Sequence, residues 1–155
     1  MDINYAIAGR VAALLTARGI TVDLLPATVP PGYTADAFIA IHSDYNNSPA
    51  MGGFKLARFR DSAIPARDDA LIAAITTEYG AATGQSRDGY ITRAMTGYYA
   101  FNGADFRHAI ASQTPGVIIE LGFLTNPADR ALLTERQETV AAGLAGGIIR
   151  FLTGA

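Results

Sequence analysis

Apolar residues recur along the chain with two periods, and these periods predict the helices and the strands. Apolar side chains at helical spacing predict four long helices, over residues 3–18, 67–79, 127–134 and 138–152. Apolar runs that are β-branched or alternate with polar residues predict four strands, over residues 20–25, 37–41, 54–59 and 117–120. We also expect a short helix over residues 105–112.

The order of these elements predicts the fold class. Helices and strands that alternate in this way favour an α/β fold, with a twisted, mostly parallel or mixed central sheet and helices on both faces. The chain has 155 residues, of which 50% are hydrophobic and 17% charged, enough for one substantial core. We therefore expect a single domain over residues 1–155.

Glu120 interrupts the most apolar of the predicted strands. The run from Val117 to Ile119 suits a strand buried on both faces, Glu120 ends it, and Gly122 gives the backbone freedom to turn. Open α/β sheets place their chemistry at the carboxyl ends of strands, which is where this pattern puts Glu120. An unpaired buried charge costs several kcal/mol, so we favour a functional carboxylate over one that only ion-pairs to hold the loop.

The strand over residues 37–41 also stops at polar residues, His42, Ser43 and Asp44. His42 and Glu120 can therefore lie on the same edge of one sheet, with His42 as a metal ligand or proton carrier. The alternative is a hydrogen-bonded histidine at a strand end. The second histidine, His108, follows Arg107 in a predicted helix and is expected to be packed or solvated rather than functional.

Composition and motifs exclude several other functions. The chain has no cysteine, which rules out disulfides, thiol catalysis and cysteine-based zinc sites. A net charge of −2 gives no basic surface for nucleic acid, and no apolar stretch is long enough for a membrane span. The amino terminus lacks the layout of a signal peptide. No GxSxG, HxH or HxxxH motif is present, so the spacing of residues alone indicates a metal only weakly.

Three stretches and the closing helix carry a family resemblance. FIAIHSD at residues 38–44, GGF at 52–54 and PGVIIELGFLTNPAD at 115–129 precede an amphipathic helix at the carboxyl end. Together they resemble the zinc-dependent N-acetylmuramoyl-L-alanine amidases, which cut bacterial peptidoglycan. The resemblance implies that His42 is a zinc ligand and that Glu120 is the catalytic glutamate. It implies hydrolysis of the amide between N-acetylmuramic acid and L-alanine.

The same resemblance sets expectations about partners and place of action. Peptidoglycan, through its stem peptide and muramic acid, is the expected partner of a monomeric enzyme. The enzyme is expected outside the cytoplasm, in the cell wall or periplasm, or to be phage-encoded and released at lysis. Four polar and aromatic residues are candidates for a substrate-binding wall without a motif behind them, namely Arg87, Arg93, Tyr98 and Tyr99.

The chain also departs from the family pattern. The family begins with a strand that ends in a zinc-binding histidine, followed by a glutamate ligand at the start of the first helix. Here Met1 falls inside that helix, and only Asp2 offers a replacement for the glutamate. Two explanations stay open: a portion of a longer amidase, which we favour, or a complete short protein with an incomplete zinc site. The second explanation predicts a non-catalytic peptidoglycan-binding or regulatory module. An unrelated α/β hydrolase is a third possibility.

Overall fold

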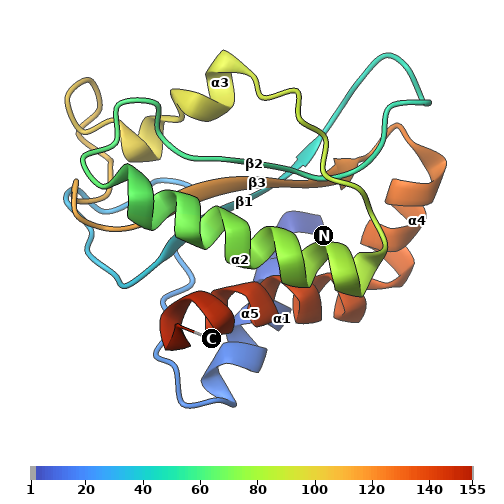
Figure 1. The fold of residues 1–155 in the computed structure, drawn as a ribbon, viewed down its shortest axis with the longest axis horizontal. Coiled ribbons are helices and arrows are strands. Elements are labelled where there is room, and N and C mark those ends of the chain that lie inside the picture. Colours follow the sequence, from blue (N-terminus) through green and yellow to red (C-terminus); the bar gives the residue numbers. More distant parts are fainter. Residues whose placement is uncertain (1–2, 155) are drawn as a thin grey trace.

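A mixed sheet of three strands forms the centre of the structure, a computed structural model that describes residues 3–154 (Figure 1). The strands are β1 (Phe38–Asp44), β2 (Lys55–Ala57) and β3 (Gly116–Phe123), in the spatial order β1-β3-β2. β1 runs parallel to β3, whereas β2 runs antiparallel to it. β3 is therefore the central strand, which explains why its sequence is the most apolar of the three.

Three long helices cover one face of this sheet. They are α1 (Ile3–Thr16), α2 (Pro65–Thr83) and α5 (Gln137–Thr153). α5 lies between the other two and approaches α2 so closely that a Cβ atom at Gly147 would lie 2.5 Å from the Cα of Ile75. These helices bury the larger apolar core against Val117, Ile119 and Leu121 of β3.

The opposite face is covered by shorter elements, α3 (Arg93–Thr96) and the 3₁₀ turn η1 (Tyr99–Phe101). In Figure 1, α3 lies on one side of the sheet and the three long helices on the other. A second, smaller apolar cluster fills this side, where Met95 and Phe101 contact Ile118 of β3. The remaining helix, α4 (Pro127–Glu135), follows β3 and begins at Asn126, whose side chain accepts hydrogen bonds from the first turn.

The α/β class and the helices on both faces are confirmed, and so are the four long helices within a few residues at their ends. The strands differ more. β1 and β3 each extend three residues beyond the prediction at their carboxyl ends, and β2 is shorter than predicted. Glu120 therefore lies within β3 rather than at its end, and Gly122 belongs to the strand instead of turning the chain.

Two predicted elements are wrong. Residues 20–25 form no strand, because they have no ladder partner among the described residues, although Ile20 and Val22 still pack on the larger core. Residues 105–112 form turns rather than a helix. There the side-chain oxygen of Asn102 accepts a hydrogen bond from the backbone of Asp105, and such local bonds compete with a helix.

Candidate active site

Strand pairing brings the two candidate catalytic residues side by side. His42 of β1 and Glu120 of β3 are directly paired in the parallel ladder. Side chains alternate along a strand, so both residues lie on the face that carries Ala40 and Ile118, away from the three long helices. The sequence predicted both residues on the same edge of the sheet; the register pairs them directly, but within the strands rather than at their ends.

Glu120 is half-buried, but its Oε2 atom is shielded from solvent. Its Oε2 atom accepts no hydrogen bond from the described residues. Burial, followed by the negative charge of Asp44, raises the pKa of Glu120 to about 7, against the lowering effect of the positive charge of Lys55. Such a carboxyl group exchanges its proton near neutral pH, which is the property required of a general acid and base.

Tyr98 lies against His42 in two ways. The Tyr98 hydroxyl is 3.0 Å from Nε2 of His42, and the two rings meet edge to face with their centroids 5.2 Å apart. Burial, followed by the neighbouring Tyr99 and Glu120, raises the pKa of Tyr98 to about 12, so its hydroxyl stays protonated at neutral pH. Tyr98 therefore fixes the orientation of the His42 ring.

A buried lysine stands on the other side of Glu120. Lys55 of β2 is paired with Glu120 in the antiparallel ladder and is only 4% exposed. Its Nζ atom lies 2.6 Å from Asp44 and 3.6 Å from Asp88, and 4.6 Å from the centre of the Phe123 ring. The ammonium group thus links the end of β1 to the strand that carries Glu120.

The sequence interpretation did not identify Lys55 or Asp88 as parts of this site. The alternation in FKLARF shows that Lys55 and Arg58 face different sides, but the register that places Lys55 next to Glu120 depends on pairing between segments far apart in the chain. A lysine within the short strand-like run FKLARF was the sequence signal that could have indicated Lys55 as part of the site.

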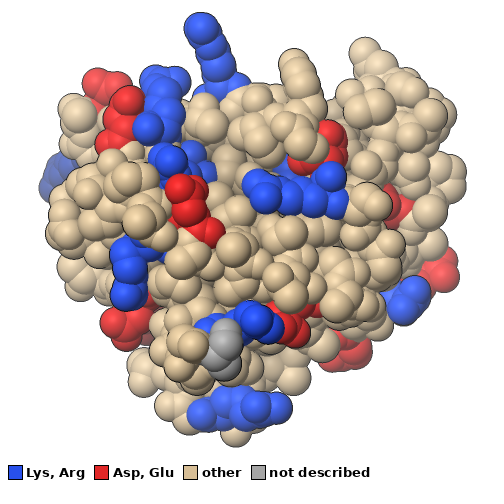
Figure 2. All heavy atoms as spheres, viewed as in Figure 1, with Lys and Arg blue, Asp and Glu red and all other residues tan. Residues whose placement is uncertain are grey.

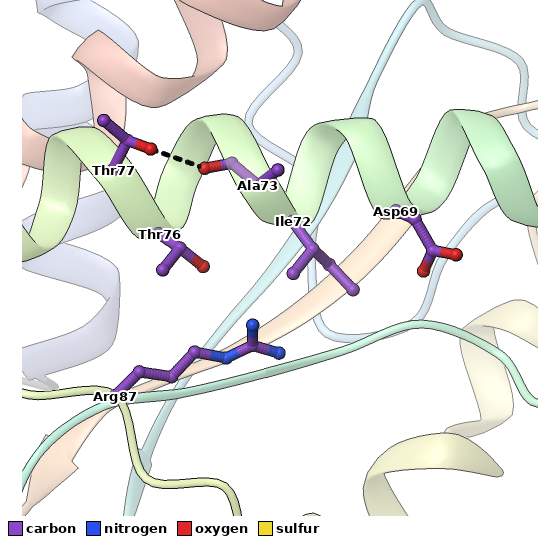
Figure 3. A pocket seen from close by; sticks show the side chains of 6 residues that line it. All are labelled: Asp69, Ile72, Ala73, Thr76, Thr77 and Arg87. Carbon is purple, nitrogen blue, oxygen red and sulfur yellow. Dashed lines mark hydrogen bonds between the residues drawn. The ribbon is translucent and has the colours of Figure 1, made fainter.

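The four candidate wall residues lie in different places. The Tyr98 ring contacts the His42 ring. The Tyr99 ring lies next to Tyr98, with 4.9 Å between the centroids of the two tyrosine rings. Arg93 is exposed on α3. Arg87 lies across from Ile72 and Thr76 of α2 in a shallow groove (Figure 3), and it donates a hydrogen bond to the carbonyl of Leu56.

His108 lies on an exposed loop, where Nδ1 is 3.0 Å from the carbonyl oxygen of Val29. It is therefore a loop residue rather than part of the site. Basic and acidic side chains are mixed over the face shown in Figure 2, without a patch of a single sign. No helix in the described part of the chain is long and apolar enough to cross a membrane.

The described residues do not complete a zinc site. A catalytic zinc is commonly held by three protein ligands. Among residues 3–154, no three His, Cys, Asp or Glu side chains lie close enough together to hold a metal ion. His42 and Glu120 remain as a pair, and Asp2, the candidate replacement for a glutamate ligand, lies outside the described residues.

Comparison with known proteins decides which family this arrangement belongs to. The family model described as N-acetylmuramoyl-L-alanine amidase matches residues 1–150. The chain belongs to this amidase family. The match covers every strand and helix of the fold except the last residues of α5. No curated protein matches the chain.

Solved amidases share the fold at low sequence identity. The catalytic domain of CwlV from Bacillus (Paenibacillus) polymyxa var. colistinus is 21% identical with a TM-score of 0.65, over 97% of this chain and 83% of that one. Ami1 from Mycobacterium smegmatis is 20% identical with a TM-score of 0.69, over 99% and 76%. CwlD from Clostridioides difficile, solved with the GerS lipoprotein, is 17% identical with a TM-score of 0.70, over 99% and 86%.

Proposed function

We propose that the chain hydrolyses the amide bond between N-acetylmuramic acid and L-alanine in peptidoglycan, with Glu120 as general acid and base. The observation that carries the proposal is the half-buried Glu120, which is paired in the ladder with His42 and whose shielded Oε2 atom accepts no hydrogen bond from the described residues. Membership of the amidase family supports the substrate. The enzyme would act as a monomer in the cell wall or periplasm, or after release at phage lysis.

Glu120 performs two proton transfers in this proposal. As the carboxylate, it accepts a proton from the attacking water. As the acid, it delivers that proton to the nitrogen of L-alanine, so that the C–N bond breaks and a free amine leaves. A pKa of about 7 suits both steps at neutral pH, because neither protonation state is rare.

Zinc dependence is part of the proposal because the family resemblance implies it, with His42 as the ligand that the described residues offer. The two further ligands of a three-ligand site would have to come from outside those residues. No proton step above depends on the metal, so the role of Glu120 and the zinc content are tested separately.

A non-catalytic peptidoglycan-binding or regulatory module is the second candidate. It is favoured by one observation, the lack of a three-donor metal cluster among residues 3–154. Such a module would keep the fold and the affinity for peptidoglycan without cleaving it.

Zinc content and cleavage by the purified chain separate the two candidates. The enzyme proposal predicts about one zinc per chain under saturating zinc, together with release of soluble peptide from purified peptidoglycan. His42→Ala is expected to lose both, whereas the control His108→Ala keeps both because the exposed His108 ring lies against the carbonyl oxygen of Val29 and not against His42 or Glu120. A chain that binds peptidoglycan but takes up no zinc and releases no peptide would establish the module instead.

A further inference from the structure

A continuous row of aromatic rings leads from the candidate active site to the surface. Successive ring centroids are 5.2 Å apart from His42 to Tyr98, 4.9 Å from Tyr98 to Tyr99, and 6.4 Å from Tyr99 to Phe106. Tyr98 and Tyr99 are half-buried, and Phe106 at the outer end is 45% exposed. The rings meet edge to face or tilted, and the row connects the candidate active site with solvent through aromatic side chains.

Hydrogen bonds hold the two tyrosine side chains of the row and the backbone of Phe106. The Tyr98 hydroxyl bonds with Nε2 of His42, and the Tyr99 hydroxyl donates to the carbonyl of Ala27. The Phe106 amide donates to the carbonyl of Asn102, 2.9 Å away. The two tyrosine rings are thus ordered before any ligand arrives, which lowers the entropic cost of binding one.

Hydrogen bonds of the Asn102 side chain hold the loop that carries Phe106. Asn102 is 6% exposed, and its side chain both donates to the Asp105 carboxylate and accepts from the Asp105 backbone. A loop pinned by a buried amide nevertheless turns a large apolar ring toward solvent, at a cost in hydration free energy.

Core packing explains the inner part of the row but not its end. Phe101, which also contacts Tyr98, is only 8% exposed and packs against Phe38 in the second apolar cluster. Tyr98 and Tyr99 border that cluster, whereas Phe106 lies outside it. Among the described residues, Phe106 meets the row at Tyr99, and its 45% exposure leaves part of the side chain available to a ligand.

We propose that Tyr98, Tyr99 and Phe106 form a binding track for the sugars of the peptidoglycan glycan strand, with Phe106 farthest from the reacting bond. The inference rests on the proposed function, because the amide to be cut is attached to a muramic acid within that strand. Sugar rings present apolar C–H faces that stack on aromatic rings, and this track begins at Tyr98, whose ring contacts His42.

Binding of the full chain to glycan strands stripped of their peptides tests this track without any need for cleavage. Phe106→Ala is expected to weaken binding of long strands about 3- to 10-fold, the loss of one stacking contact, while Phe106→Trp restores it. The matched control is Tyr5→Ala, which removes an aromatic ring 64% exposed on α1 and should leave binding unchanged. Affinity for isolated stem peptides should be the same in all four proteins.

The outcomes separate this inference from the proposed function. Glycan binding that depends on Phe106 in a chain that cleaves nothing would keep the track and overturn the enzyme proposal. A chain that cleaves peptidoglycan but binds glycan equally well with Phe106→Ala would keep the enzyme and overturn the track. Equal weakening by Tyr5→Ala, or weakened binding of stem peptides alone, would also overturn it.

Discussion

Two carboxylates on and beside β3, the buried Asp129 and the half-buried Glu120, differ in their partners. Asp129 is 6% exposed, and it accepts hydrogen bonds of 2.9 Å from the backbone amides of Gly53 and Phe123 and from the side chain of Gln85. Glu120 has an Oε2 atom that accepts none from the described residues and a pKa raised to about 7. A satisfied carboxylate stabilises the fold, whereas an unsatisfied one is available for chemistry.

Asp68 belongs with Asp129 in this comparison. It is 3% exposed, and it accepts hydrogen bonds from the backbone of Gly116, 2.9 Å away, and from the hydroxyl of Ser62, 2.5 Å away. Asp68 ties α2 to the start of β3, and Asp129 ties α4 to its end. Glu120 lies within β3, between its start and its end. No described residue donates a hydrogen bond to the Oε2 atom of Glu120.

The largest expected effect is on catalysis. Glu120→Gln removes the group that moves protons, so release of soluble peptide from peptidoglycan should fall about 10²- to 10⁴-fold while the melting temperature is preserved. Glu135→Gln, at an exposed glutamate at the end of α4, is the control and should keep full activity. Unchanged release by the Glu120 variant would end its assignment as acid and base.

Asp129→Ala should show the opposite pattern. It leaves three donors without their acceptor, and we expect the free energy of unfolding to fall by about 3–5 kcal/mol in denaturant titrations. Asp69→Ala is the control, because that carboxylate is exposed on α2 and its ion pair with Arg58 contributes little. A loss of less than about 1 kcal/mol in the Asp129 variant would remove its structural role.

Lys55→Met tests how the cation beside Glu120 affects the pKa of Glu120 and the stability of the fold. It keeps the side-chain length but strands Asp44, and because Asp44 is partly exposed we expect a loss of about 2–3 kcal/mol in the free energy of unfolding. The pKa of Glu120 should rise, since Lys55 lowers it in the native chain. Carboxyl-detected NMR titration of the metal-free chain measures that shift, and a lower pKa would contradict the electrostatic role of Lys55.

The smallest effect is the dependence of stability on pH. Glu120 has a folded pKa of about 7, above its ordinary 4.5, so its contribution is fully present below pH 4.5 and is lost as the pH rises through 7. Allowing for solvent screening, the metal-free chain should lose about 1–2 kcal/mol over this range. Glu120→Gln should lack this loss and Glu135→Gln should keep it. Identical pH profiles of the native chain and the Glu120 variant would show that the carboxyl group is not buried.

The candidate pair could be predicted from the sequence because its signal is local. Both His42 and Glu120 follow short apolar runs, and parallel pairing of two such runs is enough to place them together. The strand ends were less predictable. β3 continues through Gly122 because Phe123 bonds to Asp129 from the following helix, a contact between segments that the apolar pattern does not encode.

The missed features depend on contacts between distant segments. Residues 20–25 alternate like a strand, but a strand also requires a partner, and the described residues provide none. Lys55 enters the site only through its register with β3. The aromatic row joins η1 to a loop whose turns are set by Asn102, so the helical pattern of residues 105–112 gave no indication of it.

The identity of the bond that is cut tests the central claim most directly. Purified peptidoglycan, incubated with the native chain under saturating zinc, would be analysed by mass spectrometry for its soluble products. The account predicts free stem peptides that begin with an unblocked L-alanine amine, together with glycan strands whose muramic acids keep a free lactyl carboxyl group. Products cut within the glycan or within the peptide, or no products at all, would contradict it.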